Sequence, residues 1–75
     1  MPKGVVEYIV KSLVEKPGQV RIVEKRENSK IMLEIHADKD DLGKVIGRDG
    51  KTIRSIRAVV GLLFSDQNLF VEVAR

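Results

Sequence analysis

The chain has 75 residues, enough for one small domain with a thin core and little spare structure for an elaborate active site. It contains no cysteine, which excludes a disulfide framework and a thiolate metal site. The formal net charge is +3, no apolar run is long enough to span a bilayer, and no signal-peptide pattern opens the chain. We therefore expect a cytoplasmic protein without a membrane partner.

The first half of the chain predicts a helix followed by two strands. Residues 3–16 carry apolar side chains at helical spacing, and Pro17-Gly18 ends this helix. Residues 19–26 favour a strand, the residues ENSK form a turn, and residues 30–37 alternate between apolar and polar side chains as a second strand does. These two strands predict an antiparallel hairpin.

The second half predicts two helices and a third strand. A short helix at residues 42–46 stops at Gly47, and a second helix runs from the RDG loop to about Phe64. The core stripe expected on this second helix is Ile53, Ile56, Val60, Leu63 and Phe64. Residues 69–74 form the last strand. The order α-β-β-α-α-β predicts an α+β fold of two layers, in which residues 1–75 form one domain and three helices cover one face of a three-stranded mixed sheet.

The segment VIGRDGKTIRSIR at residues 45–57 concentrates the positive charge. Residues 1–42 carry eight basic and eight acidic side chains, whereas residues 43–57 carry five basic side chains and one acidic. Such a patch is typical of a polyanion binder, although a solvated helix face explains the charge alone equally well. The GKT within the segment is not a nucleotide-binding P-loop, because that motif needs glycine at the position of Val45 and must follow a strand.

The same segment suits a nucleic-acid backbone. Gly47 and Gly50 let the chain turn sharply and let phosphate approach without interference from a Cβ atom. The first amides of the second helix are unpaired and positively polarised at this point. Lys44, Arg48 and Lys51 surround the loop. Arg54 lies off the core stripe, and Arg57 lies at its edge, where its long stem can carry the charge outward.

The string VIGRDGKTIRSI resembles the signature of the KH domain, in which an IGxxG loop joins two helices. The element order resembles the type II KH topology, and the size is similar to that of the small stand-alone bacterial KH proteins of the KhpA family. The resemblance implies a non-enzymatic protein of the RNA chaperone or regulator type that binds about four nucleotides of single-stranded RNA, or alternatively single-stranded DNA. It makes the residues from Gly47 to Gly50 a clamp, Ile46 and Ile53 an apolar floor, and part of the second strand the other wall of a groove. The residues assigned to RNA binding are Lys44, Ile46, Gly47, Arg48, Asp49, Gly50, Lys51, Ile53, Arg54 and Arg57.

Asp49 and an apolar helix face qualify this interpretation. The carboxylate of Asp49 opposes phosphate, unless it caps the second helix. Away from the core stripe, the second helix carries a second apolar face comprising Ser55, Ala58, Val59 and Leu62. We expect dimerisation through this face, and the family resemblance implies a homodimer or a pair with a larger KH-containing protein. The alternatives are a pseudo-KH interaction module that binds RNA weakly and a DNA-binding helix-turn-helix.

Residues that could support catalysis are sparse. His36 is the only histidine and falls on the polar face of the second strand. Asp40 and Asp41 are adjacent where a helix needs capping. The sequence therefore predicts no catalytic residue, no metal site, no cofactor and no small-molecule substrate.

Overall fold

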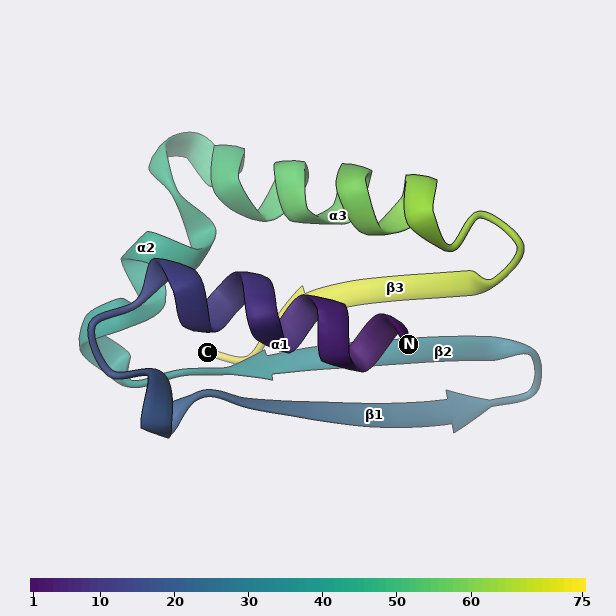
Figure 1. Ribbon diagram of the computed structural model, residues 1–75, viewed down its shortest axis with the longest axis horizontal. Coiled ribbons are helices and arrows are strands. Elements are labelled where there is room, and N and C mark those ends of the chain that lie inside the picture. The colour runs from purple at the N-terminus through teal and green to yellow at the C-terminus, as the bar shows by residue number, and fades with distance from the viewer.

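The computed structural model describes residues 1–75 and has the predicted order of helices and strands (Figure 1). The main elements are α1 (Pro2–Leu13), β1 (Arg21–Glu27), β2 (Lys30–His36), α2 (Leu42–Ile46), α3 (Lys51–Leu63) and β3 (Asn68–Val73). Three single-turn 3-10 helices that the sequence patterns did not predict lie between them: η1 (Pro17–Gln19), η2 (Lys39–Asp41) and η3 (Arg48–Gly50). No helix is long and apolar enough to cross a membrane.

The sheet has the order β1-β2-β3 and is mixed, as predicted. β1 and β2 are antiparallel, with Ile22 opposite Ile35, whereas β2 and β3 are parallel, with Leu33 opposite Val71. The α2–α3 segment is the crossover that makes the second pair parallel. β2 is therefore central, and β1 and β3 are both edge strands. The helices lie over one face, and α3 runs alongside β3 (Figure 1).

The core lies between this helical layer and the sheet. Along β2 the alternation places Ile31, Leu33 and Ile35 in the core and the residues between them on the open face, as predicted. The buried apolar residues are Val6, Val10, Val20, Ile22, Ile31, Leu33, Ile35, Val45, Ile53, Ile56, Val60 and Val71. This set is small, so each member contributes substantially to a domain of this size.

The predicted core stripe of α3 is wrong at Leu63. Leu63 is 60% exposed, whereas Phe64 is partly buried against the core. The reason lies in the position of α1, whose Ile9 and Leu13 lie beside Ile56 and Val59 rather than beside the last turn of α3. No element covers that side of the last turn.

The first helix ends earlier than predicted, at Leu13, because a distant carboxylate binds the amides that follow it. Asp41 is 1% exposed and accepts hydrogen bonds from the backbone N–H groups of Glu15 and Lys16, both at 3.1 Å. Lys16 also precedes a proline, which disfavours the helical conformation there. Asp41 therefore fastens the end of α1 to the start of α2. Its position in the sequence suggested that its side chain caps α2, but the structure shows no such hydrogen bond.

Candidate nucleic-acid interface

The loop between α2 and α3 is built from left-handed backbone conformations. Gly47 ends α2 by donating its N–H to the carbonyl of Gly43 at 2.8 Å and has φ 79° and ψ 168°, a combination that is open essentially to glycine alone. Gly50 has φ 75° and ψ 15° and is the N-cap of α3. The two glycines predicted to bracket the loop are thus required by its geometry.

The space around the two glycines differs. A Cβ atom on Gly47 would lie 2.3 Å from Thr52 Oγ1 and 2.7 Å from the backbone nitrogen of Thr52. A Cβ atom on Gly50 would meet only Nη1 of Arg54, at the end of a flexible side chain, at 3.0 Å. The chain therefore makes its closest approach to α3 at Gly47.

Asp49 has a conformational role that the sequence did not reveal. Its φ of 56° and ψ of 25° are left-handed, and aspartate and asparagine tolerate this region better than most residues do. The alternative that it caps α3 is wrong, because the N-cap is Gly50 and no side chain caps this helix. The first amides of α3 are therefore left without a side-chain partner beside the loop.

The basic side chains of the loop and of the first turns of α3 are free. Arg48, Lys51 and Arg54 are exposed, and no ion pair in the structure involves them. The guanidinium group of Arg54 donates a hydrogen bond to the carbonyl oxygen of Asp49, so it reaches back over the loop. Three unneutralised cations therefore lie around the uncapped end of α3, where the helix dipole adds to their potential.

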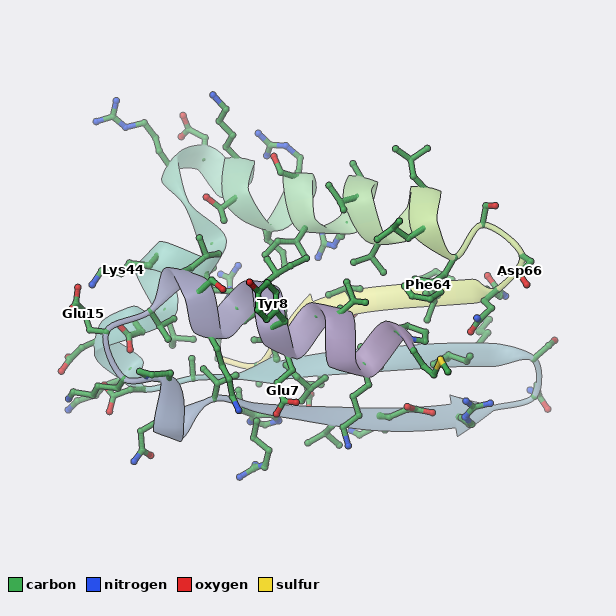
Figure 2. The ribbon with its side chains drawn as sticks, in the orientation of Figure 1. Glu7, Tyr8, Glu15, Lys44, Phe64 and Asp66 are labelled. Carbon is green, nitrogen blue, oxygen red and sulfur yellow. The ribbon has the colours of Figure 1, made fainter.

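Lys44 differs from these cations. Its ammonium group lies 3.3 Å from a carboxylate oxygen of Glu15 (Figure 2). It also lies 3.7 Å from a carboxylate oxygen of Asp41. Burial raises the pKa of Asp41, but the N–H groups of Glu15 and Lys16 and the neighbouring lysines outweigh it and hold the pKa below its ordinary value of 3.8. Asp41 is thus a carboxylate at neutral pH. Lys44 neutralises this charge, so Lys44 is not an unpaired cation as Arg48, Lys51 and Arg54 are.

The two isoleucines predicted as an apolar floor lie in different environments. Ile53 is 6% exposed and belongs to the core, whereas Ile46 is partly buried against the core. Ile46 therefore offers more surface beside the loop than Ile53 does.

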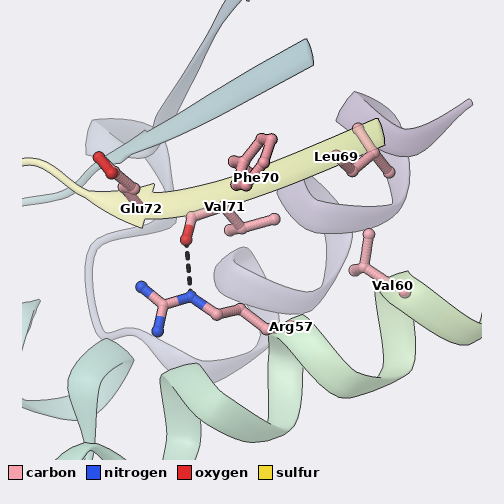
Figure 3. Close-up of a pocket in the computed structure, with 7 residues that line it drawn as sticks. Arg57, Val60, Leu69, Phe70, Val71 and Glu72 are labelled. Carbon is pink, nitrogen blue, oxygen red and sulfur yellow. Dashed lines mark hydrogen bonds between the residues drawn. The ribbon is translucent and has the colours of Figure 1, made fainter. Parts of the chain in front are cut away.

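A groove lies between α3 and β3 (Figure 3). It has a volume of about 220 Å³ and is lined by Arg57, Val60, Gly61, Leu69, Phe70, Val71 and Glu72. Arg57 crosses it and donates from Nε to the carbonyl oxygen of Val71 at 2.8 Å. The resemblance implies the second strand as a wall, but β2 is paired on both sides, and the sheet residues that line this groove belong to the edge strand β3. Arg57 is correspondingly tied to β3 rather than directed freely outward.

The predicted second apolar face of α3 is exposed. Val59 is 46% and Leu62 is 81% exposed, and Ser55 and Ala58 are also exposed. Between α3 and α1 lies a further groove, lined by Ile9, Leu13, Thr52, Ser55, Ile56 and Val59. The contribution of α1 could not be predicted from the sequence, because a helical pattern does not indicate which helix packs beside it.

His36 lies on the open face of the sheet, as predicted. Its Nε2 lies 2.9 Å from a carboxylate oxygen of Glu34. This hydrogen bond is the main reason why the pKa of Glu34 is lowered from its ordinary value of 4.5, against a smaller opposing effect of burial. The pair is a local contact within β2.

The α-β-β-α-α-β order, the mixed sheet and the glycine-bracketed loop between two helices define a KH domain of the type II topology. The model of the KhpA/KhpB KH-domain family matches residues 3–74. The chain belongs to this family.

Curated relatives carry the name RNA-binding protein KhpA. The relative from Chlamydia pneumoniae is 38% identical over 71 residues, which cover 95% of this chain and 91% of the relative. The relative from Thermotoga maritima is 34% identical over 74 residues, or 97% and 99% of the two chains, and that from Clostridium perfringens is 45% identical over 58 residues, or 77% of each. No solved structure matches the chain.

Proposed function

We propose that this KH domain, comprising residues 1–75, binds single-stranded RNA by clamping the sugar-phosphate backbone with the loop from Gly47 to Gly50. The observation that carries the proposal is the set of three unpaired cations, Arg48, Lys51 and Arg54, around an uncapped helix end. Phosphate oxygens accept hydrogen bonds from free backbone amides and charged side chains at such a position. The names of the relatives support RNA as the ligand.

The groove supports the second half of the proposal, in which bases occupy the space between α3 and β3. Its walls are largely apolar, and the free edge of β3 offers backbone groups for hydrogen bonds to base edges. Arg57 holds the two walls together through Val71 and retains guanidinium donors that its Nε does not use. One domain contacts only about four nucleotides at a time, so we expect its affinity for RNA to be modest.

We further propose that two copies pair through the exposed face of α3. A chain with so thin a core gains stability by burying Val59 and Leu62, and two linked clamps gain avidity for one RNA. The adjoining groove on α1 would accept the partner's side chains. A larger KH-containing protein is the alternative partner, and the RNA chaperone or regulator role proposed for the chain fits either assembly.

Titration of fluorescently labelled single-stranded RNA tests the clamp. Arg48→Asp replaces an exposed cation that makes no ion pair, so the fold is expected to persist. At low salt, reversing the charge about 4 Å from a phosphate changes the interaction by about 2 kcal/mol, or roughly thirtyfold in affinity. The matched control is Lys3→Asp, which makes the same charge change at the far end of α1. Equal affinities for Arg48→Asp and Lys3→Asp would contradict the clamp, and duplex DNA in the same titration tests the helix-turn-helix alternative.

Sedimentation tests the pairing. Leu62→Glu places a charge at the centre of the proposed interface and is expected to give monomers, whereas Ser29→Glu, in the turn between β1 and β2, adds the same charge and is expected to leave the dimer intact. A dimer of Leu62→Glu as stable as the wild type would place the interface elsewhere. Normal pairing combined with absent RNA binding would instead favour the pseudo-KH alternative.

A further inference from the structure

Phe70 is a large apolar side chain that the core does not use. It lies on β3 and points to the open face of the sheet, where it is 43% exposed. The register places it in one row with Met32 of β2 and Lys25 of β1. It also lines the groove between α3 and β3, so it lies at the rim where the groove meets the open sheet face (Figure 3).

A free cation lies over the ring of Phe70. The Nζ atom of Lys30 is 5.8 Å from the ring centroid, and no carboxylate pairs with Lys30. Such a contact is worth little at an exposed site, so Lys30 can leave the ring at small cost. An exposed aromatic ring beside an unpaired basic side chain is the combination with which proteins hold single-stranded nucleic acid.

The order of groups along the groove links this ring to the clamp. α3 begins at the loop, and its Arg57 faces Val71, whereas Gly61 lines the groove farther along the helix together with Leu69 and Phe70. At a rise of about 1.5 Å per residue, the axis of α3 advances about 15 Å from Lys51 to Gly61. Gly61 has no atom within 4 Å of the position of a Cβ, so this end of the groove is open. A strand that runs from the clamp along the groove therefore leaves it beside Phe70.

We propose that the RNA continues beyond the groove and that one base stacks on the ring of Phe70, while Lys30 moves from the ring to the adjoining phosphate. This inference rests on the proposed function and extends it by a site outside the clamp. Stacking on an aromatic ring is tolerant of base identity, because every base has a π face. The site therefore adds affinity for longer RNA without adding sequence preference.

The test compares labelled oligouridylates of four and seven nucleotides. For the wild type we expect the longer RNA to bind more tightly. Phe70→Leu keeps an apolar side chain but removes the ring, and it is expected to reduce this gain, the ratio of the two affinities, at least about fivefold. Phe70→Tyr keeps a ring and is expected to retain the gain. The number of registers available on the longer RNA is the same for all three proteins and does not affect the comparison.

Two further readouts separate the possible failures. Lys30→Gln is expected to lower the salt slope by about 0.7 for the seven-nucleotide RNA and not for the four-nucleotide RNA. If wild type and Phe70→Leu gain the same affinity from the longer RNA, the site at Phe70 is overturned. The same conclusion holds if Phe70→Leu changes only the oligomeric state and keeps this gain. If Arg48→Asp leaves binding of both RNAs unaltered, the clamp itself fails, and the proposal for Phe70 fails with it.

Discussion

Replacing Gly47 by alanine is the perturbation that bears most directly on the loop geometry. The backbone of Gly47, at φ 79° and ψ 168°, lies in a region that costs other residues about 1–3 kcal/mol. The added Cβ atom would also lie 2.7 Å from the backbone nitrogen of Thr52, which a side-chain rotation cannot relieve. We expect Gly47→Ala to lower the free energy of unfolding by an amount at the upper end of that range, or to shift the loop away from α3.

Two other glycines provide graded controls. The added Cβ atom of Gly50→Ala meets only Nη1 of Arg54, whose flexible side chain can move aside, so the left-handed backbone is expected to account for a cost of about 1–2 kcal/mol. Gly61→Ala lies inside α3 with open space around the new atom, and is expected to stabilise the chain by about 0.5–1 kcal/mol. The expected order of stability is therefore Gly61→Ala, wild type, Gly50→Ala and Gly47→Ala.

Urea denaturation followed by circular dichroism gives the free energies of unfolding, and an RNA titration follows on the same samples. Gly47→Ala should show the largest loss of stability or of RNA affinity. Adding Thr52→Ala to Gly47→Ala should restore only part of this loss, because the contact with the backbone nitrogen of residue 52 remains. If Gly47→Ala matches Gly50→Ala in both measurements, the close contact between Gly47 and Thr52 does not constrain this loop.

Asp49→Asn keeps a residue that tolerates the left-handed conformation and removes the negative charge, so we expect RNA to bind about threefold more tightly at low salt, the effect of relieving a repulsion of about 0.7 kcal/mol at about 6 Å in water. An affinity that does not change would show that the carboxylate points away from the phosphates. Asp41→Asn is expected to lower the melting temperature at neutral pH, whereas Asp40→Asn, at an exposed site, should have little effect. Because the pKa of Asp41 is lowered on folding, its stabilisation is present above its ordinary value of 3.8 and is lost as the pH falls through the folded value. Melting curves between pH 2 and 7 should therefore show a weaker acid dependence for Asp41→Asn, with Glu34 supplying part of what remains, and an unchanged dependence would contradict this assignment.

The local part of the fold could be predicted from the sequence. The bounds of α2 are as expected, since Gly47 stops it, and the alternation along β2 identified its core face correctly. The end of α1 could not be predicted in the same way, because it is set by Asp41, which lies 26 positions after Glu15 in the chain. Leu63 was misplaced for a related reason, since helical periodicity does not show where a neighbouring helix stops.

The site was predictable where one segment builds it and not where two segments meet. The spacing of Gly47 and Gly50 indicated a sharp turn between helices, and the structure confirms that turn. The groove wall, by contrast, depends on which strand lies at the edge of the sheet. The family resemblance implied the second strand, whereas residues of β3 line the groove. The neutralisation of Lys44 by Glu15 and Asp41 and the attachment of Arg57 to Val71 also join distant segments. The alternation of β3 places Phe70 on the outer face of the strand, but its position beside the groove depends on how α3 packs against β3.

Arg48, Lys51 and Arg54 are the side chains proposed to hold phosphate groups of single-stranded RNA. The most direct test is the slope of log K against log salt concentration for wild type and for the triple variant with glutamine at these three positions. Each lost phosphate contact on a single strand is expected to reduce the slope by about 0.7, so the triple variant should show a slope smaller by about 2. A slope equal to that of the wild type, at any affinity, would show that these side chains do not bind the backbone.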